Sequence, residues 1–284
     1  MTEIKAKADI TSRKWLMTAE SFKHPAKMSI PVLLWIVQRY TKRGDMILDP
    51  MAGAGTTMLA CWLGRNCVLV ELEQKFVDMC NASWEKLRRM PPALGFEMGH
   101  CEIRQGDARQ LAGVLVDVVI FSPPYSDVIR RGNSGGPGAS GKGKPPSCLA
   151  CYSEDPSNIG NLPYGDIDVV IASPLTEAKE NIGNTKGDTY LRAMRIVYQQ
   201  CYRCLKPHGL MILVVKPCIR NQQVIHLERD TQKLCESVGF TFLEEHYRRL
   251  THMTFWRTLY YSKHPKVERV DKEFILVFRK EASV

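Results

Sequence analysis

The chain has 284 residues, of which 44% are hydrophobic, and 39 Lys and Arg against 30 Asp and Glu give it a net charge of +9. This composition excludes a disordered or fibrous protein, and the apolar stretches are far shorter than the ~20 residues of a membrane-spanning helix. The first fifteen residues lack the apolar centre of a secretory signal, so we expect a cytoplasmic protein without a membrane partner. The positive surplus favours a polyanionic partner, because Lys and Arg replace counterions on phosphates.

Ten cysteines are spread along the chain, mostly inside apolar segments. Thiols in such positions are typical of a reducing compartment, so we expect no structural disulfide. Two pairs have the Cys-x-x-Cys spacing of zinc sites, Cys148 with Cys151 and Cys201 with Cys204. The second pair falls in an apolar helical pattern that suits a core better than a metal, so we predict no metal site.

Segments with the pattern of buried strands alternate with segments of helical periodicity. Strands are predicted at 45–50, 66–73, 116–122, 209–216, 241–249 and 272–280, and helices at 55–65, 74–90, 189–205 and 225–239. Strands that alternate with helices of this length pair in parallel through crossovers, which predicts an α/β fold with a doubly wound, mostly parallel sheet. The last two strands are candidates for an antiparallel hairpin.

Residues 126–187 interrupt this alternation. Within them, residues 132–146 read GNSGGPGASGKGKPP and have almost nothing to bury. We predict a flexible insertion in a single domain that spans residues 1–284, and the insertion is a candidate target-recognition region. Its lysines and arginines suit a loop that reaches a phosphate backbone, and a solvated linker would have the same composition.

The sequence DVVIFSPPYSDV at 117–128 has a weaker echo, DIDVVIASPLTEA, at 166–178. Only the first copy keeps both prolines and the tyrosine. Two explanations remain open. The two copies form a hairpin-like excursion around the insertion, or the second copy is a strand that leads into the next helix.

A glycine-rich turn follows the first predicted strand in ILDPMAGAGTT, residues 47–57. Glycines let backbone amides approach a ligand closely, and the N-terminus of the next helix offers unpaired N–H groups. Open α/β sheets bind nucleotides at such a turn, although a purely structural turn would contain the same glycines. The candidate ligand contacts in this turn are Asp49, Pro50, Gly53, Gly55, Thr56 and Thr57.

Two acidic residues follow the next two strands. Glu71 stands at the carboxyl end of the second strand, where it could accept hydrogen bonds from ribose hydroxyls. Asp107 lies on the loop after the expected third strand, where it could accept from an adenine amino group. Either acid alone is commonly a loop carboxylate or a helix cap. In this order with the glycine turn, the two acids predict a nucleoside pocket.

These residues, together with SPPY at 122–125, resemble those of the S-adenosylmethionine-dependent DNA amino-methyltransferases, which methylate N4 of cytosine or N6 of adenine. DPMAGAGTT is similar to the family's DPxxGxGTT cofactor loop, and SPPY to its catalytic [DNS]PP[YFW] tetrapeptide. HPAKM at 24–28 is similar to the HPxxKP element, and RCLKPHGLMILVVK at 203–216 to the RVLKPGG turn and fifth strand. His208 and Met28 depart from the pattern, where the family has Gly and Pro.

The resemblance implies a Rossmann-like methyltransferase domain with S-adenosylmethionine as its cofactor. Lys27 would then pair with the carboxylate of the cofactor, and His24 would have a structural role. The glycine turn, Glu71 and Asp107 would hold the remainder of the cofactor.

The SPPY turn suits methylation of an exocyclic amine, whose lone pair is conjugated with the ring and therefore a poor nucleophile. The Ser122 hydroxyl and the Pro123 carbonyl can accept hydrogen bonds from the amine, and Pro123 and Pro124 stiffen the backbone that carries them. Tyr125 is suited to stack on a base that is flipped out of the duplex. The four residues are therefore candidate catalytic residues.

We predict a site-specific methyltransferase that acts on double-stranded DNA, with N4-cytosine favoured over N6-adenine because Ser stands at position 122. A cognate restriction endonuclease is a candidate partner, and the oligomeric state is not predicted. One alternative is an RNA amino-methyltransferase that acts on tRNA or rRNA. Another is a nucleic-acid-binding protein that keeps the fold without the activity.

The segment 246–266, HYRRLTHMTFWRTLYYSKHPK, interleaves basic and aromatic residues. This composition is typical of surfaces where bases stack and phosphates dock. A partly exposed β-hairpin whose aromatic residues pack on the sheet would have the same composition.

Overall fold

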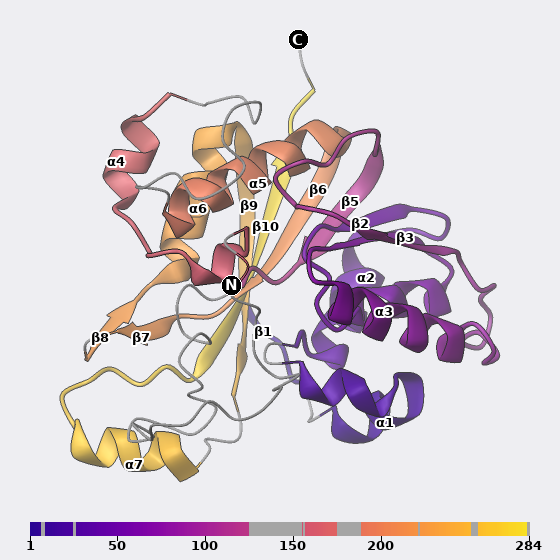
Figure 1. Ribbon diagram of the computed structural model, residues 1–284, viewed down its shortest axis with the longest axis horizontal. Coiled ribbons are helices and arrows are strands. Elements are labelled where there is room, and N and C mark those ends of the chain that lie inside the picture. Colours follow the sequence, from indigo (N-terminus) through magenta and orange to yellow (C-terminus); the bar gives the residue numbers. More distant parts are fainter. Residues whose placement is uncertain are drawn as a thin grey trace.

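The computed structural model describes residues 1–6, 9–24, 27–124, 155, 157–174, 189–220, 222–250 and 255–282 (Figure 1). One eight-stranded sheet runs through the molecule, and a short two-stranded ribbon lies beside it. The strands of the sheet are β1 (Thr2–Glu3), β2 (Met46–Asp49), β3 (Asn66–Glu71), β4 (Cys101–Gln105), β5 (Val116–Phe121), β6 (Leu205–Val215), β9 (Phe240–Arg249) and β10 (Lys272–Lys280). The ribbon pairs β7 (Cys218–Arg220) with β8 (Gln223–Ile225).

The order of strands across the sheet is β1-β9-β10-β6-β5-β2-β3-β4. Strands β2 to β6 pair in parallel with their neighbours, while β10 is antiparallel to both β6 and β9. Consequently β9 runs in the same direction as β6. The carboxyl ends of β2 to β6 and of β9 therefore lie along one edge of the sheet, which we call the carboxyl edge.

The strand order reverses between β2 and β5. The chain proceeds from β2 outward to β3 and β4, and then returns to the centre to form β5 on the other side of β2. In open α/β sheets the crevice at such a reversal, at the carboxyl ends of the strands, is where ligands bind.

Buried side chains of the central strands alternate between two cores, one on each face of the sheet. On β5, Val118 and Ile120 belong to one core, whereas Val119 and Phe121 belong to the other. The first core is covered by α2 (Ile30–Tyr40), the 3₁₀ helix η2 (Thr56–Leu63) and α3 (Gln74–Leu87), and the second by α5 (Tyr190–Cys204) and α6 (Leu227–Val238). The predicted doubly wound, mostly parallel, Rossmann-like sheet is confirmed.

The predicted elements correspond to β2, β3, β5, β6, β9 and β10 and to η2, α3, α5 and α6. The antiparallel pairing of the last two strands is also confirmed, with Phe274 opposite Tyr247. Helix α2 was not expected, nor were the short elements before it, which are β1, α1 (Ile10–Leu16) and the 3₁₀ helix η1 (Ala19–Lys23).

Two sequence interpretations are wrong. The second SP copy is not a strand, because residues Ile167–Ala172 form helix α4, whose first N–H groups are capped by the Asp166 carboxylate. The segment 246–266 is not a β-hairpin, because only its start belongs to β9, and Phe255–Lys263 form helix α7.

The insertion predicted at 126–187 lies partly within the described residues. Residues 157–174 form the 3₁₀ helix η3 (Ile159–Asn161) and α4. The remainder of this range lies outside the described residues, so its role in target recognition and the single-domain organisation stay predictions.

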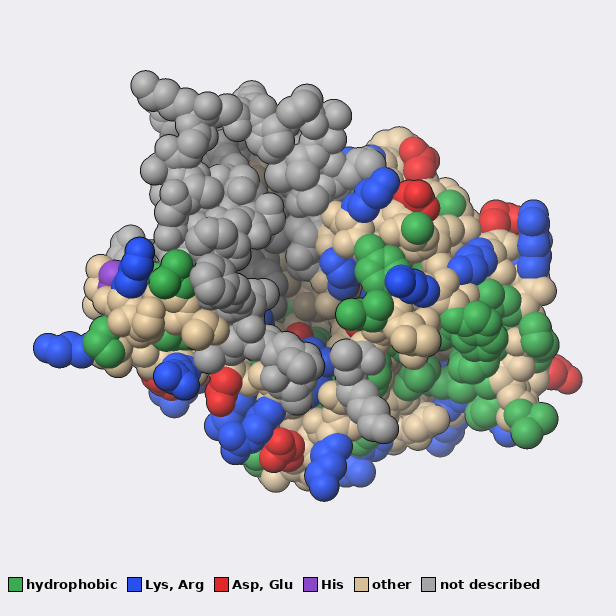
Figure 2. Space-filling view, turned by 90° about the horizontal axis from the view of Figure 1, so that it is seen from below, with side chains coloured by type: hydrophobic (Ala, Val, Ile, Leu, Met, Phe, Trp, Pro, Cys, Tyr) green, Lys and Arg blue, Asp and Glu red, His purple; other side chains and the backbone are tan. Residues whose placement is uncertain are grey.

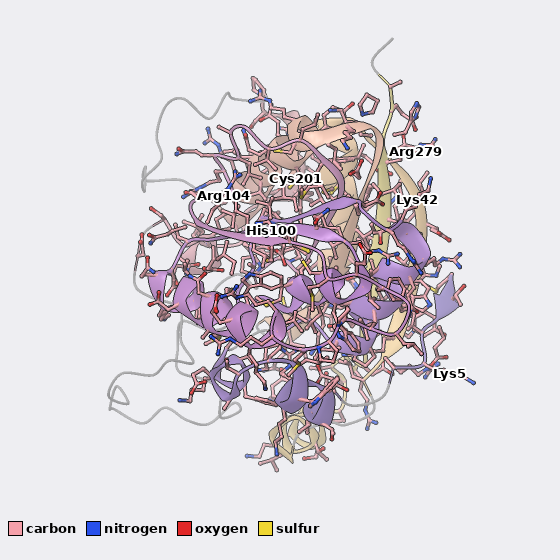
Figure 3. The ribbon with its side chains drawn as sticks, turned by 90° about the vertical axis from the view of Figure 1, so that its right-hand side faces the viewer. Lys5, Lys42, His100, Arg104, Cys201 and Arg279 are labelled. Carbon is pink, nitrogen blue, oxygen red and sulfur yellow. The ribbon has the colours of Figure 1, made fainter. Side chains whose placement is uncertain are left out.

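The cysteines of the described part are free thiols. Cys201 and Cys204 are buried in α5, and the Cys204 Sγ donates to the backbone oxygen of Leu111 (Figure 3). Cys148 and Cys151 lie outside the described residues. Among the residues that the structure describes, no cluster of His, Cys, Asp and Glu could hold a metal ion. None of the described helices combines the length and apolarity needed to cross a bilayer.

Candidate functional site

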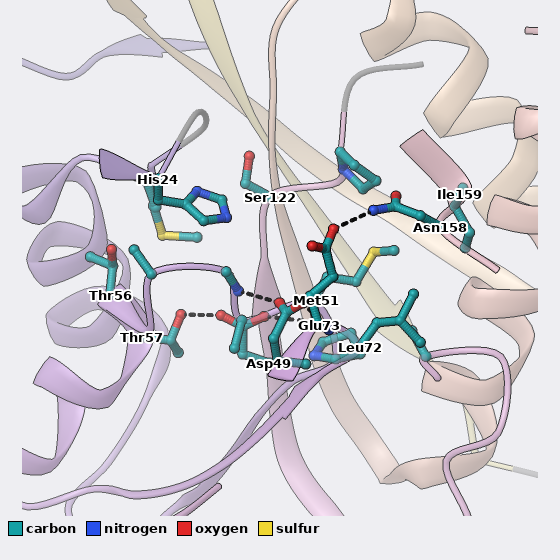
Figure 4. A pocket seen from close by; sticks show the side chains of 18 of the residues that line it. His24, Asp49, Met51, Thr56, Thr57, Leu72, Glu73, Ser122, Asn158 and Ile159 are labelled. Atoms are coloured by element: carbon teal, nitrogen blue, oxygen red, sulfur yellow. Dashed lines mark hydrogen bonds between the residues drawn. The ribbon is translucent and has the colours of Figure 1, made fainter. Parts of the chain in front are cut away.

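A cleft opens at the carboxyl edge, where the strand order reverses (Figure 4). Its walls are the turns that follow β2, β3, β4 and β5, together with residues 157–159 and the segment around His24. It encloses about 840 Å³ of empty space, counting the part open to solvent. The predicted site residues that line it are Lys27, Asp49, Pro50, Gly53, Thr56, Thr57, Glu71, Asp107, Ser122 and Pro124.

Two of the predicted site residues that the structure describes do not line this cleft. Gly55 has a φ of 74°, and a Cβ there would come within 2.6 Å of Met58 and 2.9 Å of the Cys80 Sγ, so it faces the protein interior. Pro123 is buried beside the cleft. Tyr125 lies outside the described residues.

Gly53 is the tightest point of the glycine turn. Its φ of 53° is in the left-handed region, and a Cβ would lie 2.8 Å from the imidazole of His24. That imidazole in turn packs edge-on against Phe76, with ring centroids 4.4 Å apart. Glycine is therefore required at position 53 both by the backbone conformation and by the closeness of His24.

Asp49 is fully enclosed at the carboxyl end of β2. Its carboxylate accepts hydrogen bonds from the Thr57 hydroxyl and, at 3.1 Å, from the Met51 N–H (Figure 4). The pKa of Asp49 is raised to about 7, chiefly by burial and also by the nearby Glu71 carboxylate, while these two hydrogen bonds lower it. The cleft thus contains a carboxyl group that a positively charged ligand would ionise.

Glu71 lines the cleft, and both of its carboxylate oxygens also accept hydrogen bonds from the backbone. One oxygen accepts from the Gly53 N–H at 2.7 Å and the other from the Glu73 N–H at 3.0 Å. Burial is the main cause that raises the pKa of Glu71, while these hydrogen bonds lower it. Glu71 therefore fixes the shape of the glycine turn.

Glu73 is a cleft residue that the sequence did not single out. Its carboxylate accepts from the Asn158 side-chain amide at 2.7 Å and pairs with the Lys75 ammonium at 2.8 Å (Figure 4). Asn158 comes from the range predicted to be an insertion, so it had no signal in the sequence. Glu73 did have one, since it stands only two residues after Glu71 and so on the same side of an extended chain.

Asp107 lines the cleft and forms a two-pronged ion pair with Arg109. The Arg109 Nε donates to Oδ1 at 3.0 Å, and Nη2 donates to Oδ2 at 2.6 Å. The same Nη2 donates to the backbone oxygen of Ser157 at 3.0 Å. This contact attaches residues 157–159 to the loop after β4.

Ser122 and Pro124 line the cleft directly after β5. The Ser122 hydroxyl donates to the backbone oxygen of Val214 on the neighbouring strand β6, at 2.9 Å. Because the proton of this hydroxyl is used in that bond, the Ser122 oxygen presents lone pairs to the cleft, as an acceptor.

Lys27 stands on the opposite wall. Its ammonium donates to the backbone oxygens of His24 at 2.6 Å and Phe22 at 3.1 Å. Burial, and next the positive charge of Arg13, lower the pKa of Lys27. An anionic ligand group here would offset that repulsion.

Arg13 of α1 is buried behind this wall, although the polar sequence around it gave no signal of burial. Its guanidinium donates to the Thr56 hydroxyl at 3.2 Å and to the Met28 backbone oxygen at 2.7 Å, and it pairs with Asp9 at 3.1 Å. Thr56 and Met28 both line the cleft. Arg13 therefore joins the glycine turn to the segment that carries Lys27.

Comparison with known proteins finds a family model that matches the first part of the chain. Residues 3–82 match the family model for N6/N4 methyltransferases, which is described as DNA methylase. The Type II methyltransferase M2.MboI from Moraxella bovis is 33% identical over 66 residues, which cover 23% of this chain and 24% of that protein. The chain thus spans about a quarter of the length of this curated relative.

Solved structures align over most of the chain at low identity. TrmN from Thermus thermophilus is 12% identical with a TM-score of 0.49, and the alignment covers 95% of this chain and 53% of that one. An S-adenosylmethionine-dependent methyltransferase from Methanosarcina mazei is 12% identical with a TM-score of 0.48, covering 87% and 98%. A Pyrococcus horikoshii protein, described provisionally as an RNA methyltransferase, is 14% identical with a TM-score of 0.47, covering 98% and 94%.

Proposed function

We propose that this chain, which over residues 3–82 matches the family model described as DNA methylase, transfers a methyl group from S-adenosylmethionine to the exocyclic amine of a base in DNA. The observation that carries the proposal is that the glycine turn after β2 and the Ser122–Pro124 turn after β5 line one cleft. A methyl donor held by the first turn and an amine held by the second would then meet without either turn moving far.

S-adenosylmethionine is the cofactor of this family, and the chemistry of the cleft fits its three parts. Asp107 and Glu73 offer carboxylate acceptors for the adenine amine and the ribose hydroxyls, and Lys27 offers a cation for the methionine carboxylate. The buried Asp49 carboxyl, once ionised, offers a negative charge that would pair with the positive charge of the sulfonium. When bound, the sulfonium supplies an electrophilic methyl group. The residues proposed to hold the cofactor are Lys27, Asp49, Pro50, Gly53, Thr56, Thr57, Glu71, Glu73 and Asp107, and Gly55 is proposed to shape the turn from its interior side.

The Ser122–Pro124 turn is proposed to hold and aim the amine. The Ser122 oxygen, whose proton is directed to Val214, accepts from one N–H of the amine, and the Pro123 carbonyl accepts from the other. Both bonds draw the nitrogen lone pair out of conjugation with the ring and toward the methyl carbon. The prolines keep the acceptors in place, because their φ angles are fixed.

We further propose that the base is flipped out of double-stranded DNA and stacks on Tyr125, because a base inside the duplex cannot reach the cleft. N4 of cytosine is favoured over N6 of adenine on the ground of Ser at position 122. A cognate restriction endonuclease remains a candidate partner.

The test is incubation of the chain with methyl-labelled S-adenosylmethionine and, separately, unmethylated genomic DNA and total RNA. Digestion to nucleosides and mass spectrometry then identify the modified base. N4-methylcytosine or N6-methyladenine in the DNA supports the proposal and decides between the two bases. Label in RNA alone would assign the chain to the RNA amino-methyltransferases. Cofactor binding without transfer to either polymer would favour a binding protein that has lost the activity.

A further inference from the structure

The chain between β9 and β10 at the carboxyl edge of the sheet, residues 250–271, is described at residue 250 and over residues 255–271. It connects the end of β9 to the start of β10, and both of these lie at that edge because β9 runs parallel to β6 and β10 antiparallel to it. The segment carries helix α7, which Figure 1 places beyond the lower end of the sheet. We call residues 250–271 the α7 segment.

The positive charge of the chain is concentrated around the α7 segment. Residues 246–272 contain seven Lys and Arg (248, 249, 257, 263, 266, 269 and 272) and two acids, at 268 and 271, so their net charge is +5. Two of these cations, Arg248 and Arg249, pair with Glu273 and Glu3, which lie outside this stretch. Figure 2 looks at this side of the molecule, and Lys and Arg side chains are frequent on its left part, where α7 lies.

The described part of the α7 segment is held together by backbone groups and tyrosines, not by its cations. The Leu250 N–H donates to the Asp271 oxygen at 2.7 Å and closes the base of the segment. Tyr261 is buried, and its hydroxyl accepts from the Val270 N–H at 2.8 Å. Tyr260 packs on Tyr261 with ring centroids 5.6 Å apart.

The cations of the α7 segment that the structure describes face solvent. Lys263, Lys266 and Arg269 are all exposed, and no ion pair joins any of the three to a carboxylate of the described residues. Charges without such partners keep their full attraction for a polyanion. Since they are spread over a helix end and the chain after it, they can reach several phosphates of one backbone.

The base of the α7 segment is connected to the wall of the cleft. Arg248, near the end of β9, donates to the Ser29 hydroxyl at 2.6 Å and pairs with Glu273 at 3.0 Å. Ser29 directly follows Lys27 and Met28, which line the cleft. A nucleic acid bound along the α7 segment would therefore lie on the same side of the sheet as the cleft that receives the base.

We propose that the α7 segment is the electrostatic docking surface for the phosphate backbone of double-stranded DNA, with Lys263, Lys266 and Arg269 as phosphate contacts. The inference rests on the proposed function, since it names the surface by which the substrate of that reaction is held. These contacts are independent of base sequence, and they position the duplex while the cleft acts on one base.

The experiment compares two triple variants with the same loss of charge. The test variant replaces Lys263, Lys266 and Arg269 by Ala. The matched control replaces Lys42, Arg43 and Arg203, which are exposed at the opposite edge of the sheet, before β2 and at the end of α5. Figure 3 places Lys42 well away from the lower end of the molecule, where α7 lies. Binding to a fluorescent 30-base-pair duplex of mixed sequence is measured by anisotropy from 50 to 300 mM salt, with S-adenosylhomocysteine present.

The test variant should bind the duplex about tenfold or more weakly at 100 mM salt, and its salt slope should fall by about 2 to 3. The control should differ from the wild type by less than about threefold, and both variants should bind S-adenosylhomocysteine and melt like the wild type. Equal weakening in test and control would overturn the docking proposal, as would loss of affinity for a matched RNA duplex but not for DNA. If the wild type transfers no methyl group to DNA, the proposed function fails instead, whichever way the two variants compare.

Discussion

The backbone N–H of Gly53 donates to the Glu71 carboxylate at 2.7 Å, while the position of a Cβ on Gly53 lies 2.8 Å from the His24 imidazole. The glycine turn is therefore held from one side by an acid of β3 and from the other by a ring that precedes α2. Its shape depends on three segments that are far apart in sequence.

Gly53→Ala is expected to weaken cofactor binding far more than it lowers stability. The left-handed φ alone costs about 1 kcal/mol for Ala, and the new methyl group must also displace His24 from the cleft wall. Gly44→Ala is the matched control, because Gly44 has a φ of 83° with no atom within 4 Å of the added Cβ. Thermal melting should fall in both variants, and calorimetric titration with S-adenosylhomocysteine should weaken only for Gly53→Ala. Equal affinities in the two variants would show that His24 has no part in shaping the site.

Affinity for S-adenosylmethionine should rise with pH through the pKa of Asp49. The folded-state pKa is about 7, so the carboxyl is mostly protonated at pH 6 and ionised at pH 8. A cation binds the ionised form, so the affinity should fall by up to about tenfold per pH unit below 7. S-adenosylhomocysteine has the same amine and carboxylate but no sulfonium charge. The ratio of the dissociation constants of S-adenosylmethionine and S-adenosylhomocysteine therefore isolates the effect of that charge. A ratio that stays constant from pH 6 to pH 8 would contradict it.

The same pKa predicts how stability without cofactor depends on pH. The pKa of Asp49 is higher in the folded protein than the usual value of 3.8, so the folded state holds a proton that the unfolded state releases. This contribution to stability is complete below about pH 4 and is lost as pH rises toward 7. Asp49→Asn should reduce the difference between the urea midpoints measured at pH 4.5 and at pH 7.5. Asp45→Asn, in the turn before β2, is the control and should leave that change as it is in the wild type.

Ser122→Ala should reduce methyl transfer by roughly a hundredfold while the affinity for S-adenosylmethionine stays close to that of the wild type. The reason is that the hydroxyl oxygen is an acceptor for the amine and not for the cofactor. Ser173→Ala is the control, because it removes the serine of the second SP copy, whose hydroxyl donates to Val169 within α4. The two readouts are the single-turnover rate and the dissociation constant. Loss of cofactor binding in Ser122→Ala would contradict the assignment of the Ser122 oxygen to the amine and would assign it to the cofactor.

Arg13→Met should destabilise the protein by about 2–3 kcal/mol and weaken cofactor binding as well. The substitution keeps much of the apolar bulk but removes the donors to Thr56 and Met28 and leaves Asp9 without its partner. Lys14→Ala, at an exposed neighbouring position of α1, should change the free energy of unfolding by less than about 0.5 kcal/mol. Urea denaturation with and without S-adenosylhomocysteine measures both effects. A destabilised Arg13→Met with unchanged affinity would leave Arg13 a purely structural role.

The sheet was predictable because its central strands are short apolar runs that end at turns. The sequence also shows the periodicity of α2, with Ser29 before it, Pro31 in its first turn and apolar residues at 33, 36 and 37, so this helix was predictable as well. The apolar run at residues 167–172 is compatible with a strand or with a helix. The Asp166 side chain caps the first N–H groups of α4, and this cap favours the helix.

The turns of the site were predictable from their glycines and prolines, but the contacts inside it were not. Glu71 and Glu73 look alike in the sequence, and the N–H of Gly53 determines which of them turns inward to the backbone. Asn158 and Arg13 reach the cleft from segments that have no motif, through pairings that only the three-dimensional arrangement creates.

Pro124 and Ser157 both stand at the cleft, so the chain leaves it after β5 and returns to it 33 residues later. The entropic cost of holding two such points of a chain together depends weakly on the number of residues between them, and each doubling of that number costs only about 0.6 kcal/mol. The length and sequence between the two points can therefore diverge widely, or be exchanged between related chains, while the walls that surround the reacting atoms keep their geometry.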